Sequence, residues 1–321
     1  MRVLIITNDI LNPYLGPSAV AHNLMKGFIQ LQEELVSDNV EINFLSLGSD
    51  TPKQLMINNN VRVINDLRTP LITLTGEIQA IIKRPKGHFD ILHSHSLYDL
   101  PMYFFKPNTI FTMHGLFWKE SKYTSNFYMR LYYSLAEARL RLYYPHLSHL
   151  VAISPYIIDE LKRKGFDTNK AVLIGNPVGD EFFSLEKEEE GLTVLFPAVL
   201  SLRKNQLVLL RAVGMIKEEL GDYKLIFTGS GDAQYAYILK RYAEKNGINA
   251  HFTGKIPYKE LLRLYSKSSL TTLTSFEETF GMSVLESMAT GTPLIASDIP
   301  AFRNLVEDGK EGFLVNPHDP K

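Results

Sequence analysis

The chain has 321 residues, a length that suits two domains of about 150 residues better than one small module. Hydrophobic residues make up 45% of it, which excludes an intrinsically disordered chain. The 34 basic and 35 acidic residues give a net charge of −1, so no general field attracts nucleic acid and we expect no nucleic-acid partner. Cysteine is absent, which excludes disulfides, thiol nucleophiles and cysteine-bound metals.

Targeting segments are not indicated. The apolar run at residues 3–6 is too short for a signal peptide and ends at Asn8. The sequence has no uninterrupted apolar stretch of about 18 residues, so it predicts no transmembrane helix. We therefore expect a soluble, cytoplasmic protein.

Short apolar runs alternate with helical patterns along the whole chain. The runs predict strands at 3–7, 41–47, 61–64, 91–95, 109–113, 150–153, 171–174, 193–198, 224–228, 250–253, 270–273 and 293–297. Helices are predicted at 18–35, 154–164, 204–220, 233–246, 259–266 and 283–290. Most strands lack alternation and suit a parallel sheet covered on both faces, so the pattern predicts a doubly wound α/β architecture.

A composition shift marks the predicted domain boundary. Residues 176–180 form a turn, and a charged run at 186–191 precedes a new strand near 193. We therefore predict an N-terminal domain at 1–178 and a C-terminal domain at 179–321. Ligands of such sheets bind at the carboxyl ends of the strands.

The most informative segment runs from residue 276 to 293. Gly281 permits close backbone approach, and the helix predicted from Ser283 offers unpaired N–H groups to an anion. The carboxylates of Glu278 and Glu286 each suit a pair of sugar hydroxyls. The same spacing fits equally well a solvated Glu278 and a Glu286 that only stabilises its helix.

This segment resembles the signature of a known enzyme family. Glu278 and Glu286 flank Phe280-Gly281, and ATGTP follows at 289–293, as in the retaining, nucleotide-sugar-dependent glycosyltransferases of family 4. Further similar segments are FDILHSHS at 89–96, TMHG at 112–115, GNPVGDEF at 175–182 and IFTGSG at 226–231. The resemblance implies the GT-B fold, in which two Rossmann-like domains face each other across a cleft.

On the donor side, the resemblance assigns roles to residues of the second domain. Glu286 would hold the ribose hydroxyls, and Glu278 the hydroxyls of the transferred sugar. Lys204, helped by Arg203, would neutralise the diphosphate as it leaves, which requires neither a metal nor a cofactor. Backbone groups of four residues would contact the sugar and diphosphate: Phe280, Gly281, Met282 and Ser283. The alternative for Arg203 and Lys204 is a solvated helix start, where basic charge opposes the helix dipole.

Weaker expectations concern three further positions. Gly229 lies in a two-glycine turn suited to the donor, and Ile256 follows a strand in the loop that faces the base in the family. Gly16 precedes a predicted helix start, where a diphosphate or sugar fits.

Histidines dominate the predicted cleft side of the first domain. His114 ends a strand, and its family counterpart approaches the donor sugar; the alternative is a buried core histidine. His93 and His95 alternate on one strand and so share a face, which with His114 also fits a metal site. No carboxylate-rich motif accompanies them, and we expect no metal.

Aromatic and basic residues interleave between positions 117 and 146. This pattern suits a surface for a lipid-linked acceptor or an anionic membrane, hence peripheral contact with the inner face. We favour the alternative, an amphipathic helix with its aromatic face in the core and basic side chains outside.

Two departures from the family pattern are visible. Ala198-Val199 stands where the family commonly has Gly-Arg, and Pro17 removes one N–H donor beside Gly16. The chain ends at Lys321, shortly after a predicted strand at 312–317, so we expect a second domain that is truncated and lacks its last helices.

The sequence thus predicts a retaining transferase of a hexosyl-type group. The donor would be a UDP- or GDP-sugar, and the acceptor a glycan or lipid-linked molecule of cell-surface polysaccharide or lipopolysaccharide synthesis. Two alternatives stay open: a non-catalytic glycosyltransferase-like binding module and a nucleotide-sugar epimerase of the same fold.

Overall fold

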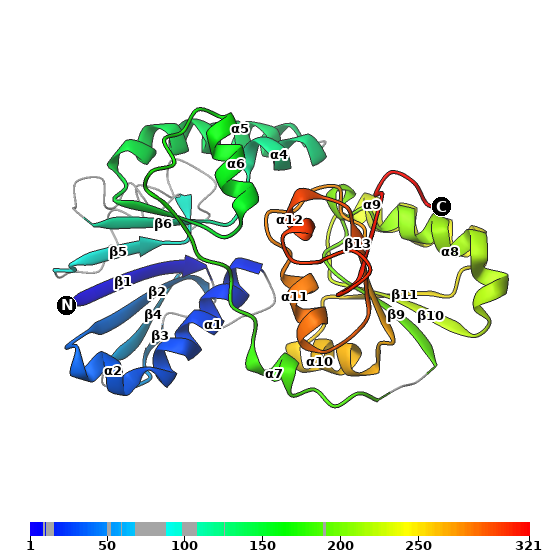
Figure 1. Ribbon diagram of the computed structural model, residues 1–321, viewed down its shortest axis with the longest axis horizontal. Coiled ribbons are helices and arrows are strands. Elements are labelled where there is room, and N and C mark those ends of the chain that lie inside the picture. The colour runs from blue at the N-terminus through cyan, green and yellow to red at the C-terminus, as the bar shows by residue number, and fades with distance from the viewer. Residues whose placement is uncertain are drawn as a thin grey trace. The chain divides into compact units, whose positions relative to one another are not determined.

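The computed structural model describes residues 1–8, 10, 16–49, 53–58, 60–67, 88–97, 108–124, 126–188 and 191–321. The chain divides into two compact units, Met1–Pro177 and Val178–Lys321 (Figure 1). Each unit contains one twisted sheet with helices packed against it.

The first unit is built on an eight-stranded sheet in the order β3-β4-β2-β1-β5-β6-β7-β8. Its strands are β1 (Arg2–Asn8), β2 (Glu41–Ser49), β3 (Lys53–Met56), β4 (Val61–Leu67), β5 (Ile91–Ser94), β6 (Thr109–Met113), β7 (His149–Ala152) and β8 (Ala171–Leu173). All neighbours pair in parallel except β3, which runs antiparallel to β4. Consecutive residues Leu4, Ile5 and Ile6 of β1 are all buried, as expected for a strand covered on both faces.

The helices of the first unit are α1 (Gly16–Gln30), α2 (Gln32–Ser37), α4 (Phe117–Glu120), α5 (Phe127–Tyr143) and α6 (Pro155–Arg163), with short 3-10 turns at Ser121–Tyr123 and Tyr144–His146. Met25 of α1 packs in the cluster that contains Ile5, Phe44 and Val63. The single helix predicted at 18–35 is interrupted at Leu31, where α1 ends and α2 begins.

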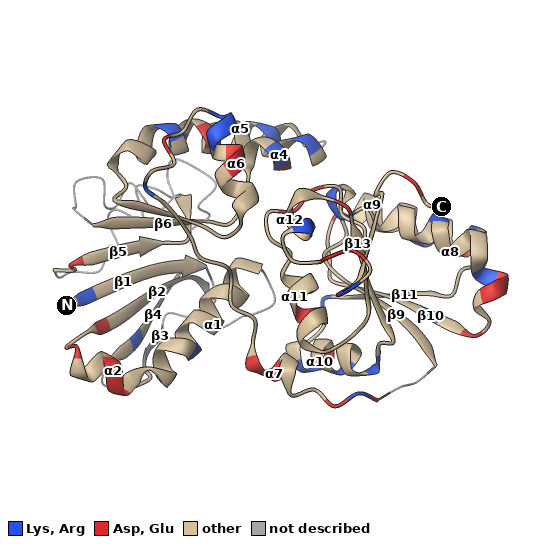
Figure 2. Ribbon diagram, viewed as in Figure 1, with Lys and Arg blue, Asp and Glu red and all other residues tan. Residues whose placement is uncertain are grey.

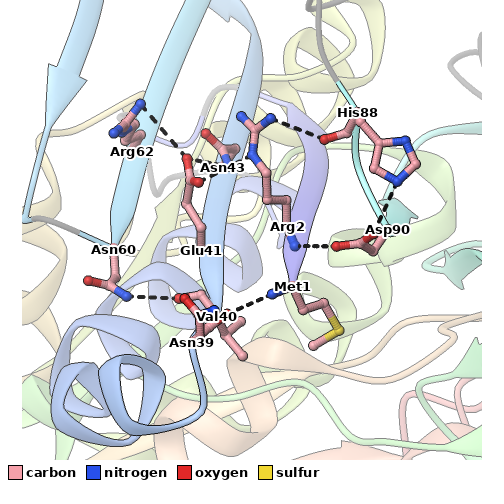
Figure 3. A network of polar contacts seen from close by, with 10 residues as sticks. All are labelled: Met1, Arg2, Asn39, Val40, Glu41, Asn43, Asn60, Arg62, His88 and Asp90. Carbon is pink, nitrogen blue, oxygen red and sulfur yellow. Dashed lines mark hydrogen bonds and ion pairs between the residues drawn. The ribbon is translucent and has the colours of Figure 1, made fainter.

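A polar network connects the amino ends of four neighbouring strands, β4, β2, β1 and β5 (Figure 3). The backbone N–H of Arg2 donates to Asp90 Oδ2 at 2.7 Å, and its side-chain Nε lies 3.2 Å from Glu41 Oε2. Glu41 also pairs with Arg62 on β4 at 3.8 Å. Ligands of such folds bind at the carboxyl ends of the strands. These contacts lie at the opposite edge of the sheet.

The second unit contains six parallel strands in the order β11-β10-β9-β12-β13-β14. They are β9 (Leu192–Pro197), β10 (Tyr223–Thr228), β11 (Ala250–Gly254), β12 (Leu270–Leu273), β13 (Leu294–Ser297) and β14 (Phe313–Val315). In chain order this is the 3-2-1-4-5-6 arrangement of nucleotide-binding sheets, whose direction of winding reverses between β9 and β12.

The helices of the second unit are α7 (Asp180–Phe183), α8 (Gln206–Leu220), α9 (Ala233–Lys245), α10 (Tyr258–Lys267), α11 (Met282–Ala289) and α12 (Pro300–Arg303), with the 3-10 turn η4 (Leu202–Lys204). Phe182 of α7 anchors the start of this unit in a core with Leu195, Ile226 and Tyr265. Among the helices described in either unit, none has the length and apolarity to cross a membrane.

Candidate functional site

The candidate site lies at the carboxyl ends of β9 and β12, where the sheet of the second unit changes winding direction. The turn η4 follows β9, and residues 274–281 follow β12. Arg203 Nη1 is 2.9 Å from Glu278 Oε2, and Lys204 Nζ is 2.5 Å from Glu278 Oε1. Ser275 Oγ donates to the same Oε1 at 2.8 Å. Three of the four residues predicted to be catalytic therefore form one ion triplet.

Charge within this triplet controls the ionisation of Glu278. Burial acts to raise the pKa of this carboxyl, but the charges of Lys204 and Arg203 and the hydrogen bonds from Lys204 and Ser275 lower it to about 2. Glu278 is 8% exposed, so the alternative of a solvated Glu278 is wrong. The side chains of Lys204 and Arg203 are 15% and 26% exposed, which leaves two positive charges within reach of an anion.

Asn205 holds the two loops of the site together. It has a left-handed backbone with φ of 53°, a conformation that asparagine adopts more readily than most residues. Its Nδ2 donates to the carbonyls of Thr274 at 3.1 Å and Pro317 at 2.8 Å. Thr274 Oγ1 donates back to the Asn205 carbonyl at 3.0 Å. Asn205 was not among the predicted site residues, although an asparagine directly after Lys204 was a signal for such a turn.

The start of α11 supplies backbone donors beside the triplet. Gly281 has φ of +111°, and a Cβ at this position would lie 2.6 Å from Cε1 of Phe302, so only glycine fits. The helix begins at Met282, one residue before the predicted Ser283. The N–H groups of Met282 and Ser283 at its start have no acceptor within the helix, whereas the N–H of Val284 donates to the Gly281 carbonyl at 3.0 Å. Ser283 Oγ donates to the Pro197 carbonyl at 2.8 Å, which fixes the helix start to the end of β9, and Phe280 is buried.

Glu286 lies one turn further along α11 and bonds to another helix. Tyr265 Oη of α10 donates to Glu286 Oε2 at 2.8 Å. Burial raises the pKa of Glu286 to about 6, while the Tyr265 hydrogen bond and the charge of Lys204 oppose this rise. The alternative role, in which Glu286 only stabilises its own helix, does not account for this bond between helices.

The glycine turn after β10 serves packing within the protein. The N–H of Gly229 donates to the Gly254 carbonyl at 2.8 Å, and a Cβ there would lie 3.0 Å from the Ala198 carbonyl oxygen. A Cβ at Gly231 would lie only 2.0 Å from the Leu200 carbonyl oxygen. The glycines therefore let this turn approach the loop after β9. Ile256 packs against the core around Phe182, and contact of its loop with a base stays a prediction.

In the first unit, His114 belongs to a histidine stack with His93 and His95, in which His95 is buried and the other two are half-buried. Its Nε2 lies 2.9 Å from Nδ1 of His95, and His93 Nε2 lies 2.7 Å from Thr112 Oγ1. Burial lowers the pKa of His93 and of His114 to about 4, with the charge of His93 adding to the effect at His114. The pKa of His95 falls well below its usual value for the same reasons, with both neighbours contributing. All three rings are thus neutral at pH 7.

His95 Nδ1 and His114 Nε2 are paired with each other. Within the parts of the chain that the structure describes, no group of three or more histidine, aspartate or glutamate side chains could hold a metal ion. Gly16 begins α1 with open space around its Cβ position. Residues 11–15, which complete that predicted loop, lie outside the described residues.

Comparison with known families accounts for both units. Residues 178–321 match the family described as glycosyl transferases group 1, and residues 27–182 match glycosyltransferase family 4. The two matches together span residues 27–321. The chain belongs to the family 4, group 1 glycosyltransferases.

Curated relatives of this chain carry sugar-transfer names. The O-antigen chain mannosyltransferase RfbU of Salmonella typhimurium is 27% identical over 223 residues, which is 67% of this chain and 58% of RfbU. The phosphatidyl-myo-inositol mannosyltransferase of Mycobacterium tuberculosis is 33% identical over 133 residues, 41% of this chain and 34% of the relative. The chain therefore spans less than two thirds of the length of these relatives.

Solved structures confirm the predicted GT-B fold of two Rossmann-like domains. The Anabaena protein HepE, solved with UDP and glucose, has a TM-score of 0.73 at 16% identity, over 100% of this chain and 87% of HepE. Sucrose-phosphate synthase from Thermosynechococcus elongatus has a TM-score of 0.73 at 20% identity, with the same coverage of each chain. These likenesses establish the fold alone.

Helix α5 of the first unit differs from the favoured prediction. Ala136, Leu140 and Tyr143 are buried, but Phe127 and Tyr128 are 71% and 80% exposed. Leu131, Leu135 and Leu142 are also exposed. The prediction that the aromatic face of this helix lies in the core is therefore wrong for its first turn. Basic residues recur along α4 and α5 (Figure 2).

Proposed function

We propose that the protein transfers a hexosyl-type group, with retention, from a UDP- or GDP-sugar to a glycan or lipid-linked acceptor of cell-surface polysaccharide or lipopolysaccharide synthesis. The observation that carries the proposal is the ion triplet of Glu278, Lys204 and Arg203 beside the start of α11. Two partly exposed cations and a set of helix N–H groups make a site for a diphosphate. The names of the mannosyltransferase relatives support the acceptor class.

In the proposed reaction, Lys204 and Arg203 stabilise the negative charge that builds on the leaving diphosphate. The bond between the sugar's anomeric carbon and the β-phosphate oxygen breaks, and the acceptor oxygen attacks the same face of the sugar. The proton of the acceptor hydroxyl passes to the departing phosphate oxygen. The protein supplies pre-positioned charge for this step and needs no metal.

Glu278 orients the transferred sugar in this scheme without bonding to its anomeric carbon. A pKa of about 2 makes its carboxylate a weak base, and hydrogen bonds from Lys204, Arg203 and Ser275 occupy both oxygens. A carboxylate held in this way is a poor nucleophile. The arrangement therefore favours attack on the same face over a covalent glycosyl-enzyme intermediate.

The test is release of UDP or GDP from a panel of nucleotide sugars in the presence of a lipid-linked oligosaccharide fraction. Lys204→Met should lower the rate by about 100-fold, because one charge that stabilises the leaving group is lost. The exposed Glu219→Gln is the matched control and should retain full activity. Activity that EDTA abolishes would contradict the metal-free scheme.

The same panel separates the two alternatives. An epimerase would convert the nucleotide sugar without releasing nucleotide and without acceptor. A binding module would release nothing, yet would still bind a partner glycosyltransferase.

The exposed side chains of α5 favour peripheral contact with an anionic membrane, which would place the protein in the cytoplasm at the inner face. Apolar side chains of such a helix enter the interface while neighbouring basic groups attract anionic lipid. Phe127→Ser combined with Leu131→Ser should reduce co-sedimentation with phosphatidylglycerol vesicles. Tyr237→Ser on α9, which is 65% exposed in the wild type, is the control and should sediment like the wild type.

A further inference from the structure

Tyr265 connects two helices of the second unit beneath the candidate donor site. Its side chain is fully buried, and its hydroxyl lies 2.8 Å from Glu286 Oε2 but 3.5 Å from the Ser283 carbonyl. The tyrosine ring packs edge-on against Phe182, with ring centroids 5.4 Å apart and an interplanar angle of 89°. The ring is therefore held in place, and its single O–H donates to the carboxylate.

We propose that Tyr265 is a positioning residue for the nucleotide, whose hydroxyl fixes Oε2 of Glu286 and presents Oε1 to the vicinal ribose hydroxyls of the donor. The inference rests on the proposed function. A glutamate side chain has several rotatable bonds, and a hydrogen bond from a locked ring removes that freedom before the ligand arrives. Tyr265 itself does not contact the nucleotide.

The hydroxyl also keeps Glu286 ionised, the form that accepts two hydrogen bonds. Burial raises the pKa of Glu286 to about 6, and the hydrogen bond from Tyr265 lowers it. The other titratable or charged groups near this carboxyl are Lys204 of η4 and Tyr258 of α10, which in turn contacts Glu181 of α7. Burial and the charge of Glu286 hold the pKa of Tyr265 well above its usual value, so the tyrosine stays a donor.

Tyr258 is a matched control within the same helix. It lies two turns before Tyr265, its ring packs edge-on against Phe182 at 6.1 Å, and its hydroxyl donates at 2.8 Å to a different glutamate, Glu181 of α7. Both tyrosines therefore bond a glutamate and pack on one phenylalanine. Tyr258 donates to Glu181, whereas Tyr265 donates to Glu286, the glutamate proposed to bind ribose.

The experiment is calorimetric titration of UDP and of GDP into wild type, Tyr265→Phe and Tyr258→Phe between about pH 5.5 and pH 8.5. In the wild type, affinity should rise with pH as Glu286 ionises near pH 6. Loss of a hydrogen bond to a charged group should move that midpoint upward by about one unit in Tyr265→Phe. Affinity at pH 6.5 should then fall several-fold, whereas Tyr258→Phe should keep the wild-type profile.

Glu286→Gln tests whether Tyr265 acts through the carboxylate of Glu286. With no ionisable group at this position, adding Tyr265→Phe should no longer change the pH profile. If the wild type binds a nucleotide but its pH profile superimposes on that of Tyr265→Phe, this inference is overturned and the proposed function is not. No binding of either nucleotide by the wild type would overturn the proposed function and the inference with it. A merely structural role for Tyr265 would lower affinity equally at every pH, which also contradicts the inference.

Discussion

The histidine stack of the first unit makes its stability depend on pH. His93 and His114 have pKa values of about 4 in the folded state, against 6.5 for an unperturbed histidine. Between these pKa values the unfolded chain binds protons that the folded chain does not bind. The contribution of these histidines to the free energy of unfolding is therefore complete above pH 6.5 and decreases as the pH falls toward 4. His95 acts in the same direction. Acidification within this window should therefore destabilise the first unit.

The size of the effect follows from these values. Lowering the pH from about 7.5 to about 5 should remove about 2 kcal/mol for each of His93 and His114, and about 4 kcal/mol together. For a unit of this size, that loss should lower the urea midpoint by about 1–2 M.

The assay is urea unfolding followed by tryptophan fluorescence. Trp118 is the single tryptophan of the chain and is buried in the first unit, so its emission reports on that unit alone. His93→Gln combined with His114→Gln should flatten the dependence on pH, whereas His149→Gln, at an exposed position of β7, should leave it unchanged. Equal midpoints at both pH values in the wild type would contradict a role of these histidines in the pH dependence of stability.

Two further predictions concern stability. Glu160→Ala should destabilise the first unit by about 2 kcal/mol, because buried Glu160 accepts from Trp118 Nε1 at 3.0 Å and pairs with two basic side chains; the fluorescence assay measures this, and an unchanged midpoint would contradict it. Gly281→Ala should lower the free energy of unfolding by about 3 kcal/mol in thermal unfolding, because the new methyl group would clash with Phe302 and the positive φ is unfavourable for alanine. Gly309→Ala is the control: Gly309 also has a positive φ but lies in open space, so only the backbone cost of about 1 kcal/mol should appear. Equal losses for the two variants would exclude the clash.

Most of the sheet could be predicted because its strands are apolar runs buried on both faces. Strand β3 was missed since Lys53–Met56 is a polar-apolar mixture that pairs antiparallel at the sheet edge, where no apolar pattern is required. The break at Leu31 between α1 and α2 was also missed, because helical periodicity continues through it.

The candidate site was predictable as residue types and only partly as geometry. Spacing and the family resemblance selected Glu278, Lys204 and Arg203. Their direct pairing could not be predicted, because Lys204 and Arg203 lie 74 and 75 residues before Glu278 in the sequence. Alternation on a strand correctly placed His93 and His95 on one face, with ring centroids 4.6 Å apart. The sequence does not single out Tyr265, because a tyrosine at helical spacing is ordinarily a core residue. Its role depends on the helix that packs against it.

The most direct test of the proposed function is release of nucleotide from UDP- and GDP-sugars by wild type and Glu278→Gln, with a lipid-linked oligosaccharide fraction as acceptor. We expect the wild type to release one of the two nucleotides and to form a product whose anomeric configuration matches that of the donor. Glu278→Gln should lower the rate by about 100-fold while the Glu219→Gln control stays active. No release from any donor, or equal rates for wild type and Glu278→Gln, would contradict the assignment of this site to glycosyl transfer.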